Sequence, residues 1–136
     1  MSTSNADLVR DFFNVIWNQR QIERIEDFIT SQSVLHSDEG DVVGPDEFKK
    51  LQYIPFTGAF PDLYVELPAV MEKGEEVVAR WVGFGTHTGD SLGFPATGKK
   101  VEFRGITWIR GLNGKFGEGW QSSNIEEVIR RLIPKE

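Results

Sequence analysis

The chain contains two histidines, and one of them lies in a segment that could support chemistry. His87 stands between glycines and threonines in GFGTHTGDSLGFPATGKKVEF, residues 83–103. An imidazole can act as a general base, a metal ligand or a group that fixes a loop. His87 falls where a strand-like run enters a glycine-rich connection, a place where imidazoles and threonine hydroxyls often bond to the backbone. The sequence therefore favours a structural role, or one at the rim of a site, over catalysis by His87.

The second histidine, His36, follows an apolar Val-Leu pair and precedes Ser37-Asp38-Glu39. Nearby carboxylates favour the charged imidazolium form of such a residue. Two interpretations stay open: His36 faces a binding site, or it belongs to a solvated loop.

A metal centre is not predicted. The sequence has no cysteine, and its two histidines are far apart and form neither H-x-H nor H-E-x-x-H. Carboxylates could complete a metal site, but no spacing selects them. We therefore expect no metal and no other cofactor.

Carboxylate chemistry has one candidate on the last predicted strand. Glu118 is flanked by Gly117 and Gly119, which remove side-chain bulk around it. Arg80 and Trp81 are neighbours on another strand and must face opposite sides of a sheet. Trp81 suits the core, whereas Arg80 in a cavity would need an acidic partner, for which Glu118 and Glu102 are available. Such a cross-strand pair is more often structural than catalytic.

Composition limits the classes of function. The 136 residues fit one domain, and 39% hydrophobic with 26% charged residues is an ordinary globular mixture. The formal charge of −6 argues against nucleic acid and anionic membranes as partners. The first residues lack the pattern of a signal peptide, and no apolar run is long enough to span a membrane. We expect a soluble cytoplasmic protein.

The elements that must position these residues form two groups. Apolar spacing predicts helices first: one capped by Ser4 and running through Ile16, then 21–29 and 44–54, with a short closing helix over 125–133. A short extended piece covers 33–37, and longer strands are predicted over 63–73, 75–87, 100–111 and 115–123. Asn113-Gly114 predicts a hairpin turn, and Pro68 predicts an edge strand or a bulge. The result is an α+β fold, a cone-shaped curved antiparallel sheet packed on N-terminal helices, whose mouth suits a small apolar ligand.

Several ordered blocks carry a family resemblance. They are F-x-x-x-F-P-D-L (56–63), V-A-R-W (78–81), G-T-H-T-G (85–89) and L-G-F-P-A-T-G-K-K-V-E-F (92–103), followed by Asn113-Gly-Lys, Glu118 and Trp120. This order resembles the SnoaL-like polyketide cyclase and ester cyclase family of the nuclear transport factor 2-like superfamily. The resemblance implies a hydrophobic small-molecule pocket, a His36 that lies toward the cavity, and a homodimer formed through the outer sheet face.

The last strand departs from the family pattern. Family members commonly carry an aspartate after the tryptophan and another three residues later, and the resemblance implies that such an acid removes a proton before aldol ring closure. Here Gln121 and Asn124 occupy those positions in EGWQSSN. An amide has no useful basicity, although it can hydrogen-bond to a substrate oxygen.

Two functions therefore compete. The first is cofactor-free acid/base chemistry, cyclisation or isomerisation, on a hydrophobic polyketide-like molecule, with Glu118 and His36 as catalytic residues. The substrate-binding residues would be Arg80, His87, Arg104, Trp108, Trp120, Gln121 and Asn124. The alternative is a binding or dimerisation module without chemistry, or a hydrolase- or hydroxylase-like variant of the same fold.

Overall fold

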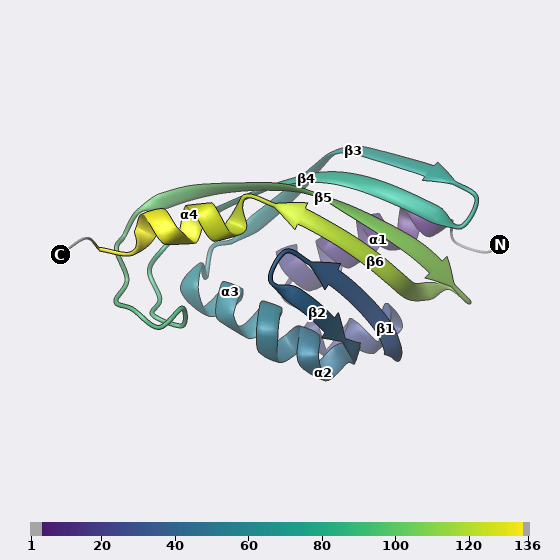
Figure 1. The fold of residues 1–136 in the computed structure, drawn as a ribbon, viewed down its shortest axis with the longest axis horizontal. Coiled ribbons are helices and arrows are strands. Elements are labelled where there is room, and N and C mark those ends of the chain that lie inside the picture. Colours follow the sequence, from purple (N-terminus) through teal and green to yellow (C-terminus); the bar gives the residue numbers. More distant parts are fainter. Residues whose placement is uncertain (1–3, 135–136) are drawn as a thin grey trace.

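The computed structural model describes residues 4–134. Its helical segments are α1 (Asn5–Phe12), η1 (Phe13–Asn18), η2 (Ile22–Asp27), α2 (Gly44–Phe48), η3 (Lys49–Tyr53), α3 (Ile54–Ala59) and α4 (Ile125–Leu132). Its strands are β1 (Ile29–Ser37), β2 (Gly40–Val43), β3 (Tyr64–Lys73), β4 (Glu76–Thr86), β5 (Lys100–Leu112) and β6 (Lys115–Ser123). The helices run continuously from α1 into η1 and from α2 through η3 into α3, so each group acts as one long helical segment (Figure 1).

The strands form one sheet in the order β2-β1-β6-β5-β4-β3. The predicted antiparallel meander from β3 to β6 is confirmed, but the sheet is mixed, because β1 pairs with β6 in parallel. The extended piece predicted over 33–37 is also longer, and the hairpin partner β2 was not predicted. A parallel pair requires a long connection, which the helices and the meander supply between β1 and β6.

The two helical segments lie against one face of the sheet and leave the other uncovered (Figure 1). A cluster of phenylalanines joins the layers: the Phe12 ring centroid lies 5.6 Å from that of Phe28, 5.8 Å from Phe48 and 5.1 Å from Phe116. Since Phe12 is on α1 and Phe116 on β6, this cluster fixes the first helix across the concave face. Among residues 4–134, no helix is long and apolar enough to cross a membrane.

Local sequence signals are realised at three places. The Ser4 hydroxyl accepts from the Asp7 backbone N–H at 3.1 Å, as a helix N-cap does. Asn113 and Gly114 have φ of 54° and 78°, as the primed hairpin turn requires. Pro68 lies on the edge strand β3, where the pairing with β4 shifts register between Glu66 and Ala69.

Strand alternation determines what faces the helices. On β4 the side chain of Trp81 is only 6% exposed and its neighbour Arg80 is exposed on the other face, as the alternation predicts. Gly105 of β5 pairs with Trp81, and a Cβ there would stand 2.4 Å from the indole and 2.8 Å from the Ser122 carbonyl oxygen. The glycine thus makes room for the tryptophan ring.

We predict that Gly105→Ala lowers the free energy of unfolding by about 1–3 kcal/mol, because the added methyl group overpacks a rigid contact. The matched control is Gly83→Ala on β4, whose Cβ would meet Leu63, Phe103 and Val65 at 3.7–3.8 Å, which is ordinary contact. That variant should be neutral or stabilised by up to about 1 kcal/mol. Denaturant titration of both proteins measures the difference, and equal stability would contradict this account of Gly105.

Candidate functional site

A cavity of about 420 Å³ lies between the helices and the concave face of the sheet. Its walls are mostly apolar and aromatic, contributed by Val9, Phe12, Phe13, Trp17, Phe48, Phe56, Trp81, Phe103, Ile109 and Phe116 among others. Exposed residues that also line it, Glu39, Gly40 and Leu51, mark an opening between the β1–β2 turn and the helical segment after β2. Such a space has the size and character of a site for a small organic molecule.

A short chain of hydrogen bonds supplies polarity to this wall. The Trp81 indole N–H donates to the Thr107 hydroxyl at 3.0 Å, and that hydroxyl donates to the Gln121 side-chain oxygen, also at 3.0 Å. All three residues line the cavity, and Thr107 is only 5% exposed. The Asn124 oxygen instead accepts from the Arg104 backbone N–H at 2.8 Å, which ties the end of β6 to β5.

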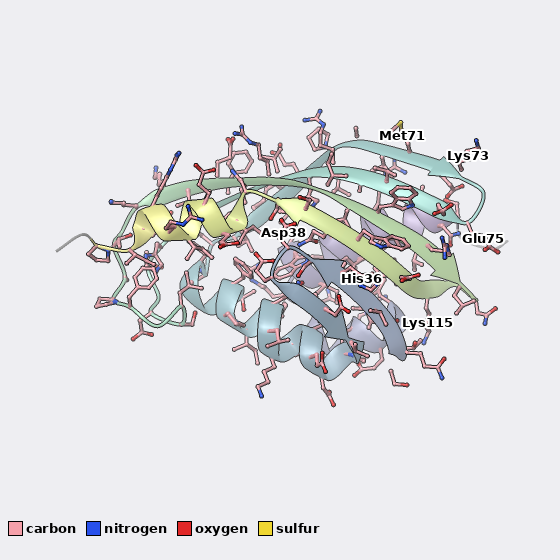
Figure 2. The ribbon with its side chains drawn as sticks, in the orientation of Figure 1. His36, Asp38, Met71, Lys73, Glu75 and Lys115 are labelled. Atoms are coloured by element: carbon pink, nitrogen blue, oxygen red, sulfur yellow. The ribbon has the colours of Figure 1, made fainter. Side chains whose placement is uncertain are left out.

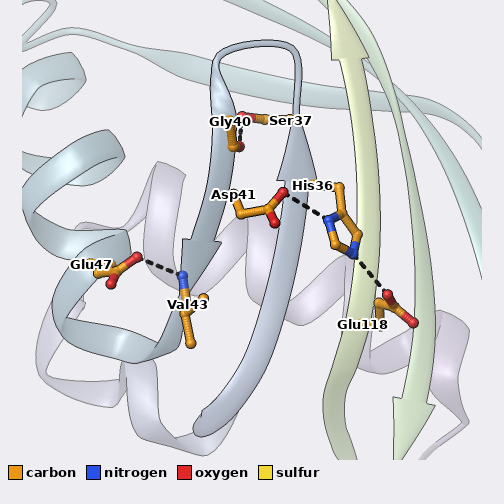
Figure 3. A network of polar contacts seen from close by, with 7 residues as sticks. All are labelled: His36, Ser37, Gly40, Asp41, Val43, Glu47 and Glu118. Atoms are coloured by element: carbon orange, nitrogen blue, oxygen red, sulfur yellow. Dashed lines mark hydrogen bonds and ion pairs between the residues drawn. The ribbon is translucent and has the colours of Figure 1, made fainter.

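The two residues predicted as catalytic, His36 and Glu118, contact each other (Figure 3). His36 Nε2 lies 2.7 Å from a Glu118 carboxylate oxygen, and Nδ1 lies 2.8 Å from the Asp41 carboxylate of β2. Glu118 also forms an ion pair with Arg110 at 3.7 Å, rather than with Arg80. Asp41, Glu118 and Arg110 come from β2, β6 and β5, so together with His36 of β1 the cluster joins four strands.

Strand register places this cluster on the outer face of the sheet. Gly119 lies opposite the buried Ile109, so Glu118 and Trp120, on either side of it, face the other way. In agreement, the Arg110 guanidinium lies 5.5 Å from the Trp120 ring centroid. Glu118 and Asp41 of this cluster are also among the residues that line the cavity. Figure 2 shows His36 on β1 beside β6.

The other predicted ligand-binding residues of the sheet share this outer face. Arg80 and Arg104 are exposed, and Trp108 is 46% exposed and donates to Glu76 at 2.9 Å. Trp120 packs at 5.8 Å from Trp108. None of these four residues is among those that line the cavity, whereas Gln121 is.

The chain resembles a known protein family over most of its length. The sequence profile of the SnoaL-like polyketide cyclase family matches residues 7–131. The chain belongs to this family. No curated protein sequence matches it significantly.

Solved structures with the same SnoaL-like fold extend over nearly the whole chain. AclR, a candidate hydroxylase from Streptomyces galilaeus, is 26% identical with a TM-score of 0.80, covering 94% of this chain and 96% of its own. A candidate polyketide cyclase from Acidithiobacillus ferrooxidans is 27% identical with a TM-score of 0.80, covering 97% of both chains. A SnoaL-like protein from Jannaschia sp. CCS1, 20% identical, superposes with a TM-score of 0.83 over 96% of this chain and 93% of its own.

His87 of this SnoaL-like chain is fully buried and does not line the cavity. Its Nδ1 accepts from the Thr97 backbone N–H at 3.1 Å, and its own backbone bonds to Lys99 and Gly98. It therefore joins both ends of the 87–99 loop, one residue of which, Leu92, lines the cavity. Its Nε2 has no hydrogen-bond partner within residues 4–134 and lies among the rings of Phe60 and Phe94 and their neighbours.

Sequence reasoning missed Thr107 and Asp41. Thr107 shares the parity of Phe103 and Ile109 on β5, so its inward direction was visible in the alternation. Its pairing with Gln121 was not, because counting from the Asn113-Gly114 turn places Thr107 opposite Trp120 instead. Asp41 belongs to β2, a strand of four residues that was not predicted.

The carboxylates hydrogen-bonded to His36 shift its pKa. The hydrogen bond to Glu118, followed by that to Asp41, raises the pKa of His36 above its ordinary value of 6.5. The pKa of His36 is therefore higher in the folded chain than in the unfolded chain. Protonated His36 thus stabilises the folded state fully below about pH 6.5, and this contribution is lost as the pH rises through the folded-state pKa.

We predict that NMR titration of the His36 ring gives a pKa above 6.5, and that Glu118→Gln lowers it more than Asp41→Asn does. The unfolding free energy of the wild type should fall as the pH rises through the measured pKa, and His36→Gln should remove that part of the pH dependence. A His36 pKa that is the same in Glu118→Gln would show that the pair does not form in solution.

Proposed function

We propose that this SnoaL-like protein binds an apolar, oxygen-bearing small molecule of polyketide-like character in its cavity. The observation that carries the proposal is the largely apolar space of about 420 Å³, whose wall includes the hydrogen-bonded polar side chains of Thr107 and Gln121. Apolar walls supply affinity in such sites, and a few placed polar groups fix the orientation of the ligand.

The same geometry favours binding over proton abstraction. The position where the family resemblance implies an acid carries Gln121, which cannot act as a base. Glu118 and His36, the remaining candidates, hydrogen-bond to each other on the opposite face of β6. A cyclase that uses these two residues would require the ligand to reach the outer face, so we place binding first and acid/base catalysis second.

We predict that 2-acetylnaphthalene, a two-ring aromatic ketone, binds with one site per chain by isothermal titration calorimetry. Gly83→Leu should weaken binding at least about tenfold, because Gly83 lines the cavity and a larger side chain would occupy it. The controls are Arg110→Gln and His36→Ala, which change the outer face at residues that do not line the cavity and should leave affinity unchanged. Loss of binding in the controls with retention in Gly83→Leu would place the ligand outside the cavity. Circular dichroism verifies the fold of each variant.

We also propose that the protein forms a homodimer through the outer sheet face, as the resemblance implies. That face exposes large apolar side chains: Tyr64, Met71, Phe84, Ile106 and Trp108. Figure 2 shows Met71 pointing away from the helices. Arginines and glutamates alternate among them, for example Arg104 beside Glu102, so a second copy can meet unlike charges and cover apolar surface at once.

The prediction is that Ile106→Lys, at a side chain 50% exposed at the centre of this face, shifts the protein from dimer to monomer in sedimentation velocity. Burying an unpaired lysine at an interface is strongly unfavourable. Ile54→Lys, at a side chain 60% exposed on α3, is the matched control and should remain dimeric. A monomeric wild type at all concentrations would contradict the proposal.

A further inference from the structure

We propose that Gln121 presents only hydrogen-bond donors to the cavity, and that the site therefore selects ligands with an acceptor oxygen such as a ketone or quinone carbonyl. The inference rests on the proposed binding function and adds the polarity of the ligand group that faces Gln121. It follows from the direction of two consecutive hydrogen bonds, from Trp81 to Thr107 and from Thr107 to Gln121.

Trp81 donates the first hydrogen bond. An indole N–H can donate but cannot accept, so its 3.0 Å contact with the Thr107 hydroxyl has one possible direction. Trp81 is 6% exposed and is held by its fit against Gly105, so this donor has a fixed place in the wall.

Thr107 forms the second hydrogen bond of the chain. Its hydroxyl has a single proton, and its oxygen already accepts from Trp81. The Thr107 oxygen has a second lone pair, but the proton of this buried hydroxyl has no acceptor among residues 4–134 other than Gln121. The 3.0 Å contact with Gln121 therefore uses the Thr107 proton, and the oxygen of the amide accepts it. The amide orientation, which is ambiguous for an isolated glutamine, is thus set by its partner.

The consequence lies at the other end of the amide. The Gln121 oxygen is engaged with Thr107, while its nitrogen makes no hydrogen bond to the described part of the chain and is not sealed inside it. Gln121 lines the cavity, so its N–H groups are available to a ligand there. A carbonyl, quinone or enolate oxygen satisfies them, whereas a purely hydrocarbon ligand leaves them unpaired in an apolar site.

The experiment compares 2-acetylnaphthalene with 2-ethylnaphthalene, which has a similar shape and no oxygen. In the wild type the ketone should bind about tenfold more tightly, the value of one neutral hydrogen bond. Gln121→Glu, measured at pH 8, replaces the donors with acceptors while Thr107 still has a partner, so the ketone should lose its advantage or bind more weakly than the hydrocarbon.

Two further variants test the hydrogen-bonded chain of Trp81, Thr107 and Gln121 itself. Thr107→Ser keeps the hydroxyl and should keep the preference for the ketone, whereas Thr107→Val frees the amide to rotate and should reduce it. In ¹⁵N spectra the side-chain amide signals of Gln121 should move with the ketone and not with the hydrocarbon, a readout available in the wild type even where a variant does not fold.

The outcomes separate the two proposals. Equal affinity for both ligands in the wild type, or an unchanged preference in Gln121→Glu, would overturn the donor assignment and leave the binding function standing. Failure of both ligands to bind would overturn the two proposals together. A tenfold preference that vanishes in Gln121→Glu and survives in Thr107→Ser supports the assignment.

Discussion

The site depends on one irregularity in the pairing of β5 with β6. Next to the hairpin turn Gly111 pairs with Phe116, but the next pair is Arg110 with Glu118, so Gly117 is an extra residue on β6. A one-residue shift moves every later side chain to the other face of the sheet. Without this bulge Glu118 would lie opposite the buried Ile109, toward the cavity. With it, Glu118 joins His36 and Arg110 outside, and Gln121 lies opposite Thr107 inside.

Glycines on β6 make this arrangement sterically possible. A Cβ at Gly119 would stand 2.8 Å from the end of the Ile109 side chain and 3.3 Å from the end of the Leu35 side chain, so a larger residue there would displace both. The strand consequently separates two environments. On the inner side it carries a neutral hydrogen-bonded chain in an apolar wall, where an unpaired charge would be costly. On the outer side it carries charges that solvent and ion pairing both stabilise.

This division explains what the sequence could and could not predict. Signals that act within a few residues were reliable: the Ser4 cap, the Asn113-Gly114 turn, the Pro68 edge strand and the alternation around Trp81. The bulge leaves no local pattern, since a lone glycine in a strand has several meanings. Glu118 was therefore identified as a candidate base without information on its face. The parallel pairing of β1 with β6, which brings His36 to Glu118, joins segments 82 positions apart and has no signature in either.

The replacement of the family acid by Gln121 is consistent with the wall that surrounds it. A carboxylate at this position would also accept from Thr107, so the hydrogen bonds from Trp81 to Thr107 and onward would be kept. Its charge, however, would lie in a mostly apolar cavity that no described cation lines. The amide keeps the Thr107 hydrogen bond without that desolvation cost, and its free end changes from acceptor to donor. The amide thus keeps the packing and the hydrogen-bonded chain of Trp81, Thr107 and Gln121. An acid at this position could remove a proton from a ligand, whereas the amide can donate a hydrogen bond to a ligand oxygen.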